Sequence, residues 1–349
     1  MADPVAGFRW ATGIEDTFIA QTGPGRRRLD EYELQQHYRL WHEDIALAAE
    51  TGFDSIRYGI PWYAVEPERG RFEWEWTDRV MAHLLDTGLD PIIDLVHYGT
   101  PLWLDDQFLN PDYPDAVASY ARAFALRYPQ ISCYTPLNEP FINAELCGLE
   151  GRWPPYLHGD SGFCSVMNQI AKGIVLTVQA LEEVRPDAIM VHVEATDHII
   201  VDESLEGRAQ LDVDRHLIAL DLIQGRAGGD DAISSYLRAH GLKDADFEWY
   251  RGNAIGIDVL GLNYYPMLSL KRHFLDSSGA TREEYIWGGG EYLAQIVRAH
   301  HERYGCPIFI TETSANEKCA LEYGFVTAED DAPPDYLRRR WLDESVATV

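Results

Sequence analysis

Basic residues are scarce in this sequence. Among 349 residues, 29 are Lys or Arg and 57 are Asp or Glu, which gives a formal net charge of −28. Nucleic-acid binding needs a basic surface, and anionic membranes attract basic segments. The composition therefore predicts no nucleic-acid partner and no membrane partner, and it favours a neutral ligand.

Cysteines are few and widely spaced, at positions 133, 147, 164, 306 and 319, and no CxxC pair occurs. An odd number of separated cysteines is typical of free thiols in a reducing compartment. The N-terminal stretch MADPVAGFRWATG has neither the basic region nor the apolar region of a signal peptide. No apolar run is long enough to span a membrane. We therefore expect a cytoplasmic protein.

Aromatic residues are abundant, with 10 Trp and 19 Tyr. Carbohydrate sites use aromatic side chains as platforms, but a large hydrophobic core also packs many of them. Composition alone leaves both interpretations open.

Short apolar segments recur along the chain and predict buried strands. Their nearly continuous apolar character is typical of strands covered on both faces of a parallel sheet. The segments are FRWATGI (8–14), FDSIRYGI (53–60), LDPIIDLVHY (89–98), ISCYTPLNE (131–139), AIMVHVEATD (188–197), AIGIDVLGLNYY (254–265) and PIFITET (307–313).

Amphipathic stretches between these segments predict helices at 33–52, 76–88, 113–129, 165–186, 291–305 and 335–349. The first places Leu34, Tyr38, Trp41, Ile45 and Ala48 on one stripe. The first two end at glycines 52 and 88, the expected stop signal. Longer loops are expected near 20–32, 99–112, 145–164, 198–211 and 266–290.

Alternating strands and helices with right-handed crossovers predict a parallel α/β sheet. An open doubly wound sheet usually has a Gly-rich turn after its first strand, and GIEDTF has none. We therefore predict a (β/α)8 TIM barrel that is incomplete, with seven strands. Residues 1–349 would form a single domain that lacks the last βα unit.

Polar side chains stand where each predicted strand ends, which predicts a lined site on one edge of the sheet. They are Glu15, Asp16, Arg57, His97, Tyr98, Asn138, Glu139, Glu194, Asp197, His198, Asn263, Tyr264, Tyr265, Thr311 and Glu312.

Two of these carboxyl groups suit the cleavage of a glycosidic bond, which needs one acid and one carboxylate on opposite sides of a sugar. Glu139 ends the fourth predicted strand and Glu312 the seventh, so they could face each other across a barrel. Arg57 is the candidate cation that would keep one carboxylate ionised, and Tyr265 could donate a hydrogen bond to it.

The chain resembles the glycoside hydrolase family 1 β-glycosidases in an ordered set of motifs. FRWATGIED resembles the opening strand, and FDSIRYGIPWYAVEPERGRFEWEWTDRV the second strand and helix. LVHYGTPLWL resembles the histidine-bearing third strand, and TPLNEP the acid/base motif. GRWPP, DVLGLNYY and FITET resemble the following loop, the sixth strand and the nucleophile motif.

The resemblance implies a role for each matching residue. Glu139 would be the acid/base and Glu312 the nucleophile, in hydrolysis with retention through a covalent glycosyl-enzyme. Asn138 would hold the sugar 2-hydroxyl and His97 the glycon. Arg57 and Tyr265 would flank the nucleophile, and Asn263 would support them. The substrate would be a small-molecule or oligosaccharide β-glycoside, with no metal and no organic cofactor.

Three features depart from the family pattern. Glu15-Asp16 stands where a glutamine usually holds the glycon, so Glu15 is a further candidate that adds negative charge beside the sugar. Tyr98 and Thr313 replace a usual tryptophan and asparagine. The sequence ends before the eighth strand, so a further C-terminal segment or a partner would complete the barrel.

Alternatives remain open from the sequence. The chain could be a sugar-binding or degenerate barrel with little turnover, or a transglycosidase, and inverting chemistry would require more widely separated carboxyl groups. His97, Asn263 and Tyr265 could be packing residues. His192, Glu194, Asp197 and His198 could resemble a metal cluster, but without HExxH or cysteine we favour structural or site-lining roles.

Overall fold

The computed structural model describes residues 7–21, 25–201, 205–316 and 335–348. The chain divides into two compact units. The first unit comprises Met1–Val193 and Ala219–Val259, and the second comprises Glu194–Ile218 and Leu260–Val349.

The first unit is built on parallel strands in the order β1 (Ala11–Ile14), β4 (Ser55–Gly59), β5 (Asp90–Asp94), β6 (Cys133–Thr135) and β7 (Ile189–Ala195). Arg57 of β4 is in register with Gly13 of β1 and with Ile92 of β5. All five residues of β4 are buried, as expected for a strand covered on both faces. A short antiparallel pair, β2 (Phe18–Ile19) and β3 (Leu29–Asp30), follows β1.

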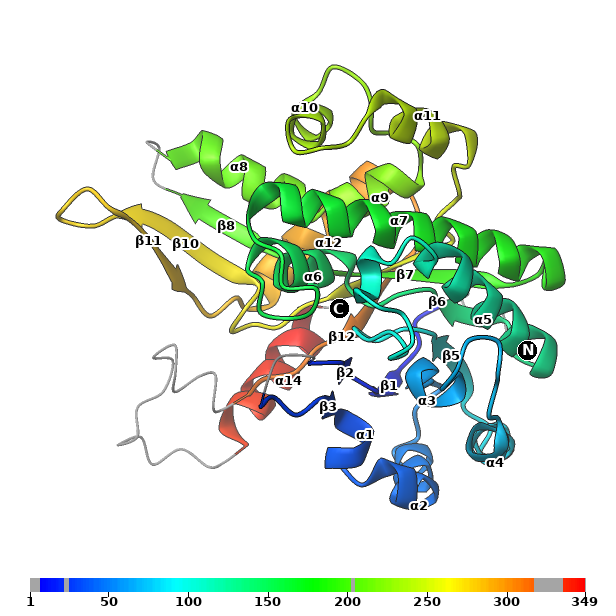
Figure 1. Ribbon diagram of the computed structural model, residues 1–349. Helices are drawn as coiled ribbons and strands as arrows, with labels where there is room; N and C mark the ends of the chain where they lie inside the picture. Colours follow the sequence, from blue (N-terminus) through cyan, green and yellow to red (C-terminus); the bar gives the residue numbers. More distant parts are fainter. Residues whose placement is uncertain (1–6, 22–24, 202–204, 317–334, 349) are drawn as a thin grey trace. The chain divides into compact units, whose positions relative to one another are not determined.

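Helices connect these strands. They are α1 (Glu31–Leu34), α2 (His37–Glu50), α3 (Trp62–Val65), α4 (Glu75–Asp86), η1 (Gln107–Leu109), α5 (Tyr113–Arg127), α6 (Pro140–Ala144), η2 (Glu145–Leu149), α7 (Gly159–Val184), α10 (Ala232–Ala239) and α11 (Asp244–Gly252). Helix α9 (Ile218–Ile223) begins in the second unit and continues into the first. Helices α5 and α7 pack side by side (Figure 1).

Helix α4 shows how the sequence pattern produces a packed element. Its buried residues Thr77, Val80, Met81 and Leu84 recur at helical spacing and form one apolar face. The helix ends just before Gly88, whose φ of 84° lies in the left-handed region that glycine adopts without a steric cost. The chain can therefore turn back at once into strand β5.

The second unit contains β9 (Val259–Asn263), which begins at the boundary residue Val259, and the parallel strand β12 (Ile308–Glu312). Its helices are α8 (Glu206–Arg215), α12 (Gly290–Tyr304) and α14 (Tyr336–Thr348). Strand β7 ends in this unit, where the Thr196 N–H donates to the Asn263 carbonyl at 3.2 Å. The described residues therefore form a seven-stranded sheet in the order β1-β4-β5-β6-β7-β9-β12.

A second sheet lies in segments that we expected to be loops. Strand β10 (Leu270–Leu275) pairs with β8 (His198–Val201) in parallel and with β11 (Thr281–Tyr285) antiparallel. The expectation of loops at 198–211 and 266–290 is therefore wrong over these strands and over α8.

The seven expected parallel strands are confirmed, but the first expected helix is not continuous. Gln36 has a φ of 61°, and this left-handed residue separates α1 from α2. Leu34 consequently leaves the expected apolar stripe and is 60% exposed, whereas Ile45 of α2 is buried. None of the described helices is long and apolar enough to cross a membrane. Cys133, Cys147, Cys164 and Cys306 are buried and form no disulfide among the described residues, and Cys319 lies outside those residues.

Candidate active site

In the first unit, a buried network links the carboxyl ends of β4 and β5. Arg57 is 4% exposed and donates through Nη2 to Asp94 Oδ2 at 2.6 Å. The Nδ1 atom of His97 lies 2.8 Å from the same Asp94 oxygen. Because the oxygen accepts from the guanidinium, the imidazole is fixed between two strands with Nδ1 as the donor.

Asn138 and Glu139 follow strand β6, as the sequence predicted. The Asn138 Oδ1 atom accepts a hydrogen bond from Arg57 Nη2 at 2.8 Å, which turns the amide nitrogen toward His97 Nε2 at 3.3 Å. Asn138 is fully buried, so its orientation is set by these partners and not by solvent.

Glu139 occupies an unusual backbone conformation at the start of α6. Its φ is 44°, in the left-handed region that costs free energy for a residue with a Cβ. The Asn143 side chain supports this turn by donating to the Asn138 carbonyl at 2.8 Å and to the Glu139 carbonyl at 3.0 Å. The Glu139 carboxyl group is buried and accepts a hydrogen bond from the Tyr98 hydroxyl.

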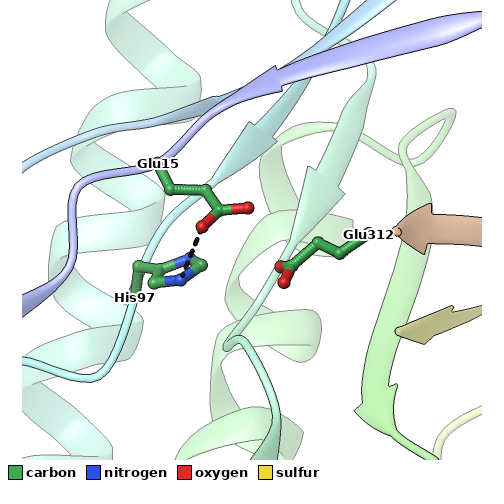
Figure 2. A group of neighbouring side chains, drawn as sticks. All are labelled: Glu15, His97 and Glu312. Atoms are coloured by element: carbon green, nitrogen blue, oxygen red, sulfur yellow. Dashed lines mark ion pairs between the residues drawn. The ribbon is translucent and has the colours of Figure 1, made fainter. Parts of the chain in front are cut away.

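Glu15 and Asp16, although adjacent, have different surroundings. The Glu15 side chain is 35% exposed, and its Oε2 atom lies 3.6 Å from His97 Nε2 (Figure 2). Asp16 is buried against strand β4, where a Cβ at Gly59 would meet its Oδ1 at 2.1 Å. Burial raises the pKa of Asp16 well above its usual range. Glu15 is therefore the one of the two that carries charge next to the histidine.

In the second unit, Glu312 ends strand β12 (Figure 2). Ile310 is in register with Leu262 and Glu312 with Asn263, so Thr311 is an extra residue on β12. Such bulges re-aim side chains and are common next to active sites. The Tyr265 hydroxyl donates to Glu312 Oε2 at 2.8 Å, which holds the carboxyl group in one orientation.

Side chains around Glu312 tie strands β9 and β12 together. The Thr311 hydroxyl donates to Asn263 Oδ1 at 2.7 Å, and the Thr313 hydroxyl donates to the Tyr264 carbonyl at 2.6 Å. The indole nitrogen of Trp341, on α14, donates to the Thr313 hydroxyl at 2.7 Å. Asn263 is thus a supporting residue of this strand pair, and Thr313 connects the pair to the last helix.

The structure brings the sequence-predicted residues together in two groups. Glu15, Arg57, His97 and Asn138 form one connected set in the first unit, which also contains Glu139. Asn263, Tyr265 and Glu312 lie on adjoining strands of the second unit.

One contributor was absent from our predicted site, and another was included without a role. Asp94 bridges Arg57 and His97, and Tyr98 donates to Glu139. Asp94 had a signal in the sequence, because it is a lone charge inside the apolar run PIIDLV. Tyr98 was among the predicted strand-end residues, but nothing in the sequence indicated its hydrogen bond to Glu139.

The four residues considered as a metal cluster have other partners or surroundings. His192 is buried in the first unit, and burial lowers its pKa to about 4. Glu194 accepts from the Ala195 N–H at 2.9 Å. Asp197 forms an ion pair with Lys271 at 2.5 Å. His198 begins strand β8. These contacts support the structural interpretation.

Comparisons with known proteins agree with the motif pattern. Residues 11–214 match the model of glycosyl hydrolase family 1. Beta-glucosidase 1 of Oryza sativa subsp. japonica is 27% identical over 150 residues, which cover 41% of this chain and 29% of that protein. An aryl-phospho-β-D-glucosidase of Bacillus subtilis is 24% identical over 372 residues, covering 91% of this chain and 73% of that protein.

A solved structure supports the fold. A β-glucosidase from Thermotoga maritima in complex with castanospermine superimposes with a TM-score of 0.79 at 20% identity, covering 98% of this chain and 84% of that chain. At this identity the likeness establishes the incomplete (β/α)8 barrel fold. The sequence alignment with the rice protein, by contrast, spans less than a third of that relative's length.

Proposed function

The chain belongs to glycosyl hydrolase family 1, and we propose that it hydrolyses β-glycosidic bonds with retention of configuration at the anomeric carbon. The proposed substrate is a small-molecule or oligosaccharide β-glycoside. The β-glucosidases among its relatives make a β-glucoside the first substrate to test.

In the first step, Glu312 attacks the anomeric carbon while Glu139 protonates the departing glycosidic oxygen. The bond to the leaving alcohol breaks as the ester to Glu312 forms. In the second step, Glu139 takes a proton from water, which displaces Glu312 from the sugar. The mechanism requires the two carboxyl groups to stand about 5–5.5 Å apart across the sugar.

The surroundings of the two glutamates support these roles. Glu139 is 5% exposed, so its carboxyl group is held by protein contacts such as the Tyr98 hydroxyl. Glu312 accepts from Tyr265, and a hydrogen bond to the ionised form favours a nucleophilic carboxylate. Arg57 acts through Asp94 and Asn138 and fixes the amide and imidazole proposed to bind the glycon.

A single observation carries the proposal. Each of the two glutamates follows a parallel strand and accepts a hydrogen bond from a tyrosine hydroxyl, in a chain that belongs to a family of glycosyl hydrolases. A carboxylate that only caps a loop does not require a tyrosine hydroxyl as a donor at the end of a parallel strand.

The test compares Glu139→Gln and Glu312→Gln on two aryl β-glucosides, one with a dinitrophenolate leaving group and one with a poorly activated phenol. Loss of general acid catalysis should cost Glu139→Gln about 10²–10⁴-fold on the poor leaving group and far less in the first step with dinitrophenolate. Glu312→Gln should lose at least about 10³-fold on both substrates, because the nucleophile is gone.

Glu302→Gln, which changes an exposed glutamate of α12, is the matched control and should behave as the unaltered protein. Product analysis without an added acceptor separates a hydrolase, which releases free sugar, from a transglycosidase. Calorimetric binding of sugars without any turnover would overturn the proposal in favour of a sugar-binding protein.

A further inference from the structure

Glu15 places a carboxylate beside the imidazole proposed to bind the glycon. Its Oε2 atom lies 3.6 Å from His97 Nε2, and about a third of its side chain is exposed, whereas His97 is almost wholly buried (Figure 2). The Glu15 carboxylate therefore lies at the solvent-accessible end of a buried hydrogen-bond network. A carboxylate only accepts hydrogen bonds, whereas a glutamine at this place would both donate and accept.

The hydrogen-bond network also determines what His97 offers. Its Nδ1 donates to Asp94, so the neutral ring has no hydrogen on Nε2. The Asn138 amide, oriented by Arg57, points its N–H toward that nitrogen, which is consistent with an acceptor there. The Glu15 carboxylate and the Nε2 edge of His97 thus lie side by side.

Asp16 does not contribute a charged carboxylate beside His97. It is packed against Gly59 in the wall of the sheet, and its raised pKa favours the neutral acid. Asp94 is also buried and is compensated by Arg57 at 2.6 Å. Glu15 therefore contributes a partly exposed carboxylate next to His97 Nε2, which neither Asp16 nor Asp94 does.

We propose that Glu15 is a specificity-determining residue and that it selects a glycon bearing a protonated amine, that is, an amino sugar. This inference rests on the proposed function, because it takes Glu15 and His97 to contact the glycon. A neutral hydroxyl has one hydrogen to donate, whereas an ammonium group has three and also pairs with the carboxylate charge. An anionic glycon is repelled by the same carboxylate.

The experiment measures dissociation constants by calorimetry at about pH 6, where an amine of ordinary pKa is protonated. The probes are glucose, its four mono-amino-deoxy isomers with the amine on C2, C3, C4 or C6, and glucuronate. The proteins are the unaltered chain, Glu15→Gln and the control Glu302→Gln.

At least one amino isomer should bind about tenfold more tightly than glucose, as a single charge-assisted contact would give. Glu15→Gln should abolish this preference and improve glucuronate binding, while Glu302→Gln changes neither. The inference is overturned if no isomer binds more tightly than glucose, or if the preference survives in Glu15→Gln.

The two proposals fail separately. If the protein hydrolyses aryl β-glucosides but shows no amine preference, the proposed function stands and this inference is wrong. If the protein shows an amine preference that depends on Glu15 but hydrolyses no glycoside, this inference about the sugar site stands and the proposed hydrolase function is wrong.

Discussion

At the scale of single residues, two neighbouring carboxyl groups are given different protonation states by their surroundings. Asp16 is enclosed by the sheet, and no hydrogen-bond partner for its Oδ1 is found among the described residues. Glu15 points toward His97 and is partly open to water. Burial penalises the charged form of Asp16 and raises its pKa, whereas the Glu15 side chain is 35% exposed.

The raised pKa of Asp16 predicts a specific dependence of stability on pH. The folded state holds the Asp16 proton above the ordinary aspartate pKa of about 4, so the group's contribution to the free energy of unfolding falls as pH rises through its folded-state pKa. Asp16→Asn is nearly isosteric and cannot ionise. Urea unfolding of both proteins across pH should therefore show the unaltered chain losing stability relative to Asp16→Asn, with a slope of up to about 1.4 kcal/mol per pH unit.

The difference between the free energies of unfolding of the two proteins at each pH reports the Asp16 carboxyl group alone, because both proteins share all other titrating groups. Stability curves that run parallel over the whole pH range would show that Asp16 is not held neutral in the folded state.

At the scale of elements, a partly buried ion pair links strand β10 of the second sheet to the segment that follows β7. Lys271 of β10 lies 2.5 Å from Asp197, which follows β7, and His216 Nε2 lies 3.3 Å from the same carboxylate. These charges lower the pKa of Asp197 and raise that of Lys271, although burial acts in the opposite direction on each. Strand β8 starts one residue after Asp197, so the pair fixes the start of that strand against β10.

Breaking this pair should be costly. Lys271→Met leaves the partly buried Asp197 without its lysine partner, and we expect a loss of about 1–3 kcal/mol in the free energy of unfolding, measured by urea denaturation. The matched control is Arg272→Met on the same strand, which removes an exposed pair with Glu284 and should cost less than about 1 kcal/mol. Equal losses in the two variants would contradict a structural role for the Asp197–Lys271 pair.

Elements with a strong local pattern were predictable from the sequence. Helix α4 shows its apolar spacing and its glycine stop, and strand β4 is buried throughout, with Ser55 and Arg57 as its polar residues. The second sheet was not predictable in the same way, because β11 reads TREEY and its residues are largely exposed. Strand β11 pairs with the preceding β10, which in turn pairs with β8 far earlier in the sequence, and this long-range pairing leaves no local signal.

The same distinction holds for the candidate site. Glu139 and Glu312 end apolar runs, which singles them out in the sequence. The left-handed conformation of Glu139 and the bulge before Glu312 depend on contacts between strands, and no periodic pattern predicts them. Asp94 was missed because its importance arises from Arg57 and His97, which it meets only in the folded chain.

At the scale of the whole molecule, the proposed chemistry assigns one essential carboxyl group to each unit. Glu139 belongs to the first unit and Glu312 to the second, so neither unit alone would have both groups that retention requires. The net charge of −28 fits a neutral or cationic sugar better than an anionic one. The single-domain organisation expected for residues 1–349 remains a prediction.

The most direct test of the account is to trap the covalent intermediate on the intact protein. A 2-deoxy-2-fluoro β-glucoside with a dinitrophenolate leaving group slows both steps, because fluorine destabilises the oxocarbenium-like transition state, while the good leaving group restores the first step. Peptide mass mapping then locates the bound sugar. We expect one fluoroglucosyl ester per chain, on Glu312. An adduct on another carboxylate, or hydrolysis of β-glucosides with inversion and no adduct, would contradict the account.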